Sequence, residues 1–249
     1  MNKLPLLEVC VDSLESAREA VRGGADRLEL CANLIIGGTT PSPFLISEAA
    51  KLGVPVHVLI RPRFGDFLFT EDEKQEQLSQ IRQLRALGAH GAVVGALRAD
   101  GTLDADFLAA CREAAGSLSL TLHRAFDVCA DARAALEQAI ELGFDTILSS
   151  GQRATAVKGA ALLGQLVQQA DGRITIMPGS GVNAGNIAQL FTATGAQAFH
   201  LSAKKKAESG MAFRRDGVPM GLDMMSEFER FVTDGAAVAA CRKALEKRI

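Results

Sequence analysis

The stretch GADRLELC, residues 24–31, decides the fold, because the same pattern returns three more times along the chain. In each copy a glycine stands where a helical pattern ends, and a strand-like apolar run follows. The later copies are GAHGAVVG, GFDTILSS and GAQAFHLS, which begin at Gly88, Gly143 and Gly195. Glycine suits the left-handed backbone position that closes many helices. The four copies contain the second, fourth, sixth and eighth predicted strands, so the repeat unit spans two strand–helix pairs.

Strand-like runs alternate with helical patterns over the whole chain of 249 residues. Eight strands that alternate with eight helices indicate parallel β-α-β units, and the fourfold repeat favours a closed eight-stranded barrel over an open sheet. The predicted fold class is therefore α/β, a (β/α)8 TIM-barrel-like fold. Barrels of roughly 250 residues commonly form one domain, and we see no linker, so we predict a single domain over residues 1–249. The predicted strands are 6–11, 27–31, 56–61, 91–95, 118–124, 146–150, 174–178 and 198–202.

Composition limits the classes of function. A net charge of -2 and a pI of about 6.1 argue against nucleic acid or an anionic membrane as the main partner. No run approaches the roughly 20 apolar residues of a membrane span, and the N-terminal residues do not resemble a signal peptide. Five cysteines form no C-x-x-C pair, and an odd number suits no complete disulfide framework. We therefore expect a cytoplasmic protein with reduced thiols.

Side-chain alternation along the predicted strands separates an outward set from an inward set. The outward set is apolar and must face the covering helices; it contains Leu7, Val9, Val11, Leu28, Leu30, Val56, Val58 and Ile60. The inward set is polar, whereas a structural barrel interior usually holds branched aliphatic residues in layers. Because barrel enzymes keep their sites at the carboxyl ends of the strands, the inward set predicts a functional site there. Its members are Glu8, Cys10, Arg27, Glu29, Cys31, His57, Arg61, Thr121, His123, His200 and Ser202.

Two thiols stand at the last inward position of neighbouring strands. These are Cys10 and Cys31, and this placement puts both within reach of one ligand. Cys129, in the loop after the fifth strand, faces the same end as a weaker third thiol. Cys111 and Cys241 fall on apolar helix faces, where cysteine behaves as a small hydrophobe.

The charged inward residues have a second interpretation. Glu8, Glu29 and Arg61 could form a buried ion-pair network that serves only the fold, although apolar replacements of such networks are often neutral or stabilising. His57 stands early in its strand, where we expect it to satisfy a hydrogen bond in the core.

Glycines and serines in the late loops predict an anion-binding site. Backbone N–H groups at a helix N-terminus can converge on an anion, and the last loops of barrels often bind phosphate. Tight-turn geometry explains the same residues equally well. The long segment 203–221 could close over the mouth as a lid or form a surface loop, and its run KKK at 204–206 is expected to be solvated. The candidate anion-binding residues are Ser150, Gly151, Gly179, Ser180, Gly181 and Ser202.

Several motifs closely resemble the CutC copper homeostasis protein family. They are ELCANLIIGGTTPS (29–42), IRPRFGDF (60–67), HRAFDVC (123–129), LSSGQ (148–152) and IMPGSGV (176–182), in the family's order and at its intervals. The resemblance implies a TIM-barrel-like cytoplasmic protein that self-associates, with a role in copper tolerance and copper binding. It further implies Cys10 and Cys31 as copper ligands. Phe64 and Thr39 depart from the family pattern, and we expect Phe64 to fill space at the barrel mouth.

Two functions follow from these residues. In the first, Cys10 and Cys31 bind Cu(I), since soft thiolates select it, while His123 or His200 adds a third ligand and the glutamates lie behind. In the second, the protein is an enzyme that acts on a small anionic, for example phosphorylated, metabolite held by the late loops. Its catalytic residues would be Glu8, Glu29, Arg61 and His123, because a glutamate beside a histidine or arginine can be tuned as a general base. We expect copper homeostasis, with the enzyme as the alternative.

Overall fold

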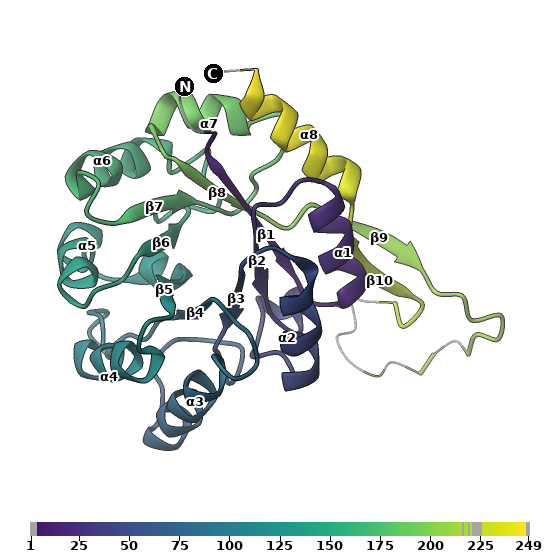
Figure 1. Ribbon diagram of the computed structural model, residues 1–249, viewed down its shortest axis with the longest axis horizontal. Coiled ribbons are helices and arrows are strands. Elements are labelled where there is room, and N and C mark those ends of the chain that lie inside the picture. Colours follow the sequence, from purple (N-terminus) through teal and green to yellow (C-terminus); the bar gives the residue numbers. More distant parts are fainter. Residues whose placement is uncertain (1–3, 216, 219, 221–225, 248–249) are drawn as a thin grey trace.

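Eight parallel strands form a ring in the computed structural model, and the eight α-helices of its described part surround that ring (Figure 1). The structure describes residues 4–215, 217–218, 220 and 226–247. This architecture confirms the predicted TIM-barrel-like α/β fold. The strands of the ring are β1 (Leu6–Val11), β2 (Arg27–Leu30), β3 (Val56–Leu59), β4 (Gly91–Val94), β5 (Ser119–Leu122), β6 (Thr146–Ser149), β7 (Thr175–Pro178) and β8 (Ala198–Leu201).

Hydrogen bonds join the ring into one sheet in the order β7-β6-β5-β4-β3-β2-β1-β8. Neighbouring strands β7 and β8 have no ladder between their described residues, although they lie next to each other. The barrel is therefore nearly closed. Its register sets the later chemistry: Glu8 on β1 lies opposite Arg27 on β2 and His200 on β8, and Cys10 lies opposite Glu29.

Most of the α-helices begin where a side chain caps the first free N–H groups. Ser42 accepts from the N–H of Leu45 just ahead of Pro43, and Thr70 and Glu73 form a reciprocal capping box. These local signals fix the residue at which each of those helices begins. The helices are α1 (Leu14–Arg22), α2 (Pro43–Ala49), α3 (Glu71–Gln83), α4 (Ala105–Ala115), α5 (Ala132–Glu141), α6 (Ala160–Ala170), α7 (Ile187–Thr194) and α8 (Gly235–Glu246).

The hydrophobic core lies between the barrel and its helices. Every residue of the outward set predicted from β1 to β3 is fully buried there, including Leu7, Leu28 and Val56. Cys111 and Cys241 belong to the same core, as their helical positions predicted. The strand period of two sends every second side chain inward, where polar residues such as Glu8 and Glu29 lie beside small apolar clusters that include Leu59 and Met177.

A two-stranded antiparallel hairpin follows the barrel. It consists of β9 (Lys204–Glu208) and β10 (Glu229–Thr233), and it projects to one side beyond α1 (Figure 1). The N–H of Thr233 on β10 donates to the hydroxyl of Ser16 on α1 at 3.1 Å. The three lysines of β9 are exposed, as predicted. The lid that we considered for residues 203–221 does not form among the described residues, because the hairpin is anchored beside α1 instead.

In the described residues, no helix combines the length and the apolar character that crossing a membrane requires.

Candidate functional site

A cavity of about 270 Å³ opens at the carboxyl ends of the strands, and we call it the mouth cavity. It brings together most of the predicted site residues. A larger hollow of about 550 Å³ opens at the opposite end of the barrel, and it is lined by none of the predicted thiols or histidines. The mouth cavity is lined by Cys10, Glu29, Cys31, Leu34, Gly37, Leu59, Arg61, Phe67, His123, Arg124, Leu148, Ser180, Gly181, Val182, His200, Leu201 and Ser202.

Glu8 lies just beneath this cavity and joins two cations. Its Oε2 accepts from Nε of Arg27 at 2.5 Å, and its Oε1 lies 2.8 Å from Nδ1 of His200. Burial by itself would raise the pKa of Glu8, but the charge of Arg27 and the hydrogen bond with His200 outweigh it and lower that pKa to about 2. Glu8 is therefore ionised, and Nδ1 of His200 is the donor in their hydrogen bond.

Three potential metal-binding atoms meet on the β1, β2 and β8 side of the mouth cavity. The sulfur of Cys10, a carboxylate oxygen of Glu29 and a ring nitrogen of His200 all lie within 4.8 Å of one another. We call these three residues the donor cluster. Nε2 of His200 lies 3.6 Å from Oε2 of Glu29. Because Glu8 holds Nδ1–H, the Nε2 atom is the one that can turn to a metal.

The protonation states of the donor cluster follow from its burial and its neighbours. Burial opposes charge on His200, but the carboxylate of Glu29 and contacts with Cys10 and Glu8 raise its pKa well above the usual value. Burial raises the pKa of Glu29, against the opposing charge of His200. The neighbouring thiol of Cys31, together with burial, raises the pKa of Cys10 well above its usual value. Without a metal, Cys10 is therefore a thiol and His200 an imidazolium.

Cys31 lines the same cavity but is not a member of the donor cluster. Its sulfur lies 3.5 Å from the carbonyl oxygen of Val11, and its side chain packs against Leu59 and Val93. The thiol pair predicted from sequence is thus present at one cavity, and the structure adds a glutamate and a histidine beside Cys10. His200, which the sequence offered as one of two possible third ligands, is the histidine next to the thiols.

Arg61 and His123 lie on another part of the wall, from the ends of β3 and β5. Nη1 of Arg61 donates to the carbonyls of Gly37 and Gly38, and Nη2 donates to the carbonyl of Gly65 at 2.8 Å. Nδ1 of His123 accepts from the N–H of Ala125 at 3.1 Å. Burial, with the nearby charge of Arg61, lowers the pKa of His123 to about 3, so the ring is neutral and carries its proton on Nε2.

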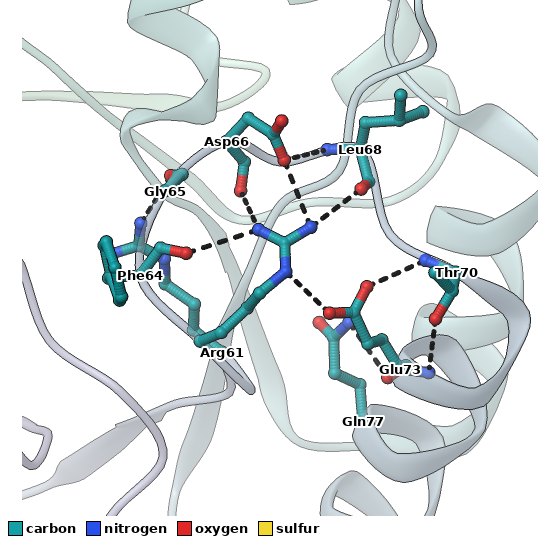
Figure 2. A network of polar contacts seen from close by, with 9 residues as sticks. Arg61, Phe64, Gly65, Asp66, Leu68, Thr70, Glu73 and Gln77 are labelled. Atoms are coloured by element: carbon teal, nitrogen blue, oxygen red, sulfur yellow. Dashed lines mark hydrogen bonds and ion pairs between the residues drawn. The ribbon is translucent and has the colours of Figure 1, made fainter.

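The loop after β3 is held by a polar network that Figure 2 shows from close by. Arg63 donates to the carbonyls of Asp66 and Leu68 and to the carboxylate of Glu73, which forms the capping box of α3 with Thr70. Phe64 is 66% exposed and does not line the mouth cavity, so our expectation that it fills the barrel mouth is wrong.

The carboxylate of Asp127 accepts hydrogen bonds from both serines of the loop after β6. Asp127 was not identified as a site residue from the sequence. Its Oδ1 accepts from the hydroxyl of Ser149 at 2.6 Å, and its Oδ2 accepts from the hydroxyl of Ser150 at 2.8 Å and from the Ser150 N–H at 3.0 Å. The N–H of Gln152 also donates to this carboxylate. Ser150, one of the donors predicted for an external anion, therefore already holds an internal one. The sequence did contain a signal for this contact: Asp127 in HRAFD follows the fifth strand, and LSSGQ follows the neighbouring sixth strand.

The six candidate anion-binding residues separate into two groups. Ser180, Gly181 and Ser202 line the mouth cavity, and their role stays a prediction. Ser150, Gly151 and Gly179 lie outside its lining; Gly151 donates its N–H to the Ser149 hydroxyl, and Gly179 donates to the Ser149 carbonyl.

The remaining candidates are part of the fold around the site. Cys129 is buried, does not line the cavity, and packs within the core between barrel and helices. Thr39 pairs with Ala32 and accepts from the side chain of Asn33 at 2.8 Å, which shapes the loop after β2. His57 is buried, and its Nδ1 has no partner among the described residues, so the core hydrogen bond predicted for it is not seen at that atom.

Comparisons with known proteins agree with the resemblance seen in the motifs. A model of the CutC family matches residues 5–205. A CutC family protein of Parabacteroides distasonis is 49% identical over 238 residues, covering 94% of this chain and 98% of that protein. The human copper homeostasis protein cutC homolog is 44% identical over 231 residues, covering 92% of this chain and 85% of that protein.

Solved structures give the same picture in three dimensions. The CutC protein of Streptococcus agalactiae is similar with a TM-score of 0.76 and 32% identity, over 79% of this chain and 98% of that one. A thiamine phosphate pyrophosphorylase from Pyrococcus furiosus has a TM-score of 0.61 at 15% identity, over 98% of this chain and 96% of that one. This second likeness shows the fold alone.

Proposed function

Because the chain belongs to the CutC family, we propose that it serves copper homeostasis by binding Cu(I) in the mouth cavity. The observation that carries the proposal is the donor cluster, in which the sulfur of Cys10 and a nitrogen of His200 lie within 4.8 Å of each other. Soft sulfur ligands select Cu(I), and imidazole also suits copper. Cys31, on the same cavity wall, supplies the second thiolate.

The surroundings of His200 support a ligand role. A metal-binding histidine usually donates its other ring N–H to a carboxylate, which fixes the ring and makes the ligand nitrogen more basic. The hydrogen bond from Nδ1 to Glu8 has this form, at 2.8 Å, and Glu8 is fixed in turn by Arg27. In the copper interpretation, Glu8 and Arg27 act by positioning His200 and do not touch the metal.

Glu29 provides a way to distinguish a Cu(I) site from a Zn(II) site. A thiolate, an imidazole and a carboxylate also make a good Zn(II) site, whereas Cu(I) gains little from a carboxylate oxygen. Loss of the Glu29 carboxylate should therefore weaken Zn(II) binding and leave Cu(I) binding nearly unchanged. Since Cu(I) and free thiolates persist only under reducing conditions, we propose a cytoplasmic location as part of the same function.

An anaerobic Cu(I) titration against a competing chelator tests the proposal. We expect tight binding of one Cu(I) per chain in the wild type and a loss of at least 100-fold in affinity in the Cys10→Ser/Cys31→Ser variant. Cys129→Ser, which removes a buried thiol outside the cavity, is the matched control and should bind as the wild type does. Unchanged affinity in the double variant, or a Zn(II) site that survives while Cu(I) binds weakly, would reject this site.

The enzyme alternative depends on a narrower set of residues than the sequence indicated. Glu8 lies beneath the cavity and is held ionised by two cations, so it is poorly placed as a general base. Glu29 lines the cavity, and its raised pKa suits proton transfer better. An enzyme at this site would lose turnover in Glu29→Gln, whereas a copper carrier would tolerate that change.

Self-association, which the family resemblance implies, stays a prediction. Exposed apolar side chains in the segment between β9 and β10, namely Met211, Phe213 and Met220, offer a surface through which two copies could meet. Measurement of the molar mass in solution tests it.

A further inference from the structure

Two hydrogen-bond donors on the wall of the mouth cavity have no acceptor among the described residues. They are Nε–H of Arg61 and Nε2–H of His123, and both side chains are more than nine-tenths buried, at 7% and 5% exposure. A buried donor without an acceptor costs about 1–3 kcal/mol, and native proteins leave few such groups without a reason. Two of them at one cavity point to a group that the protein binds there.

The positive charge of Arg61 indicates which kind of ligand binds beside it. Its three other hydrogen bonds go to neutral backbone carbonyls, and no carboxylate among the residues the structure describes forms a salt bridge with it. A buried cation is normally paired with an anion, because desolvation without a partner is expensive. The missing partner of Arg61 is therefore an acceptor with negative charge.

His123 contributes a donor that cannot turn into an acceptor. Its Nδ1 accepts from the N–H of Ala125, which assigns the ring proton to Nε2. The ring of Phe67 packs against both groups, with its centroid 4.9 Å from that of His123 and 5.0 Å from the guanidinium carbon of Arg61. All three residues line the mouth cavity, and the two donor atoms are themselves covered, so a ligand must displace neighbouring side chains to reach them.

We propose that Arg61 and His123 form an oxyanion-binding subsite, which takes the carboxylate or phosphate group of a small metabolite into the mouth cavity. This inference goes beyond copper binding and uses none of the copper ligands. The cavity of about 270 Å³ has room for a body of roughly ten non-hydrogen atoms, at the volume that water occupies in the liquid. Apolar side chains such as Leu34, Leu59 and Val182 flank that body. Its other end faces the donor cluster.

The ¹⁵N NMR resonance of the His123 ring in the wild-type protein tests the subsite without any substitution. The chain, labelled with ¹⁵N in its histidines, is titrated with inorganic phosphate or with acetate, and sodium chloride at the same ionic strength is the control. We expect the Nε2 resonance of His123 to shift and saturate with one or both oxyanions and to stay in place with chloride. Saturation with phosphate alone assigns a phosphate ester, and saturation with acetate alone assigns a carboxylate.

Two variants sharpen the result. Asparagine can keep the acceptor for the Ala125 N–H while it removes the outer donor, so His123→Asn should bind the same oxyanion at least 10-fold more weakly, the loss expected for a hydrogen bond to a charged group. Cys129→Ser, which removes a buried thiol outside the cavity, is the matched control and should bind the oxyanion as the wild type does. The inference is overturned if neither oxyanion moves the His123 signal more than chloride does, or if His123→Asn retains full affinity.

Discussion

Replacement of Glu8 by glutamine should destabilise the protein strongly at neutral pH, because this carboxylate is the shared partner of two buried cations. It is 1% exposed, it lies 2.5 Å from Nε of Arg27, and it lies 2.8 Å from Nδ1 of His200. Its pKa of about 2, against an ordinary value of 4.5, corresponds to about 3 kcal/mol of stability. A glutamine at this position lacks that contribution and leaves Arg27 without a counter-ion.

The pH dependence gives this prediction its sign. Because the pKa of Glu8 is lower in the folded protein than in the unfolded chain, its contribution is complete above about pH 5. It is lost as the pH falls through the folded pKa and amounts to only about 1 kcal/mol at pH 3. The difference in unfolding free energy between wild type and Glu8→Gln should therefore shrink from about 3 kcal/mol at pH 7 to about 1 kcal/mol at pH 3.

Urea unfolding, followed by circular dichroism at both pH values, measures this difference. Glu15→Gln is the matched control, since Glu15 pairs with Arg230 on the exposed surface and its loss should change stability little. A Glu8→Gln variant that unfolds within 1 kcal/mol of the wild type at pH 7 would refute the reasoning. So would a difference that does not depend on pH.

Three further changes test other parts of the molecule. Cu(I) affinity should fall from pH 8 to pH 6, measured by chelator competition, because binding must displace protons from Cys10 and His200, whose pKa values are both raised; an affinity independent of pH would contradict the ligand set. Asp127→Asn should lower the unfolding free energy, measured in urea, by about 1–3 kcal/mol, because it removes the charged acceptor of the hydrogen bonds from the Ser149 and Ser150 hydroxyls. Wild-type stability in this variant would show that those hydrogen bonds contribute nothing. Leu28→Ala should cost about 2–5 kcal/mol in the same assay, because it opens a cavity in the fully buried core, and a smaller loss would mean that the core collapses around the gap.

The barrel was predictable because its signals are local and repeated. Each helix that precedes a barrel strand ends near a glycine, that strand follows within a few residues, and strand period alone separates Leu28 from Glu29. The hairpin of β9 and β10 was missed because neither run shows a clear apolar alternation. Lys204 pairs with Thr233 across a long intervening segment, and no short-range turn signal indicates that pairing.

The site was predictable in its members and less so in their contacts. The thiols Cys10 and Cys31 were placed at one cavity from strand ends alone, and they do line one cavity. The occupation of Ser150 by Asp127 was not foreseen, because the two residues belong to different loops that only the packing of β5 and β6 brings together. Phe64 was expected at the mouth, yet the network around Arg63 turns the loop so that this ring is exposed.

The sequence by itself determined the barrel, the side of each strand that faces inward, and the polar residues at the carboxyl ends of the strands. These properties depend on the period of two along a strand and on glycines at helix ends, which are visible within a few residues. Only the tertiary structure decided which inward groups meet. Register across β1, β2 and β8 joins Glu8 to His200, 192 residues apart, and sets Cys10 opposite Glu29. It also leaves Arg61 and His123 each with a donor that no described residue accepts. Such partnerships arise when the ends of the sheet come together around the barrel, and no local pattern of residues specifies them.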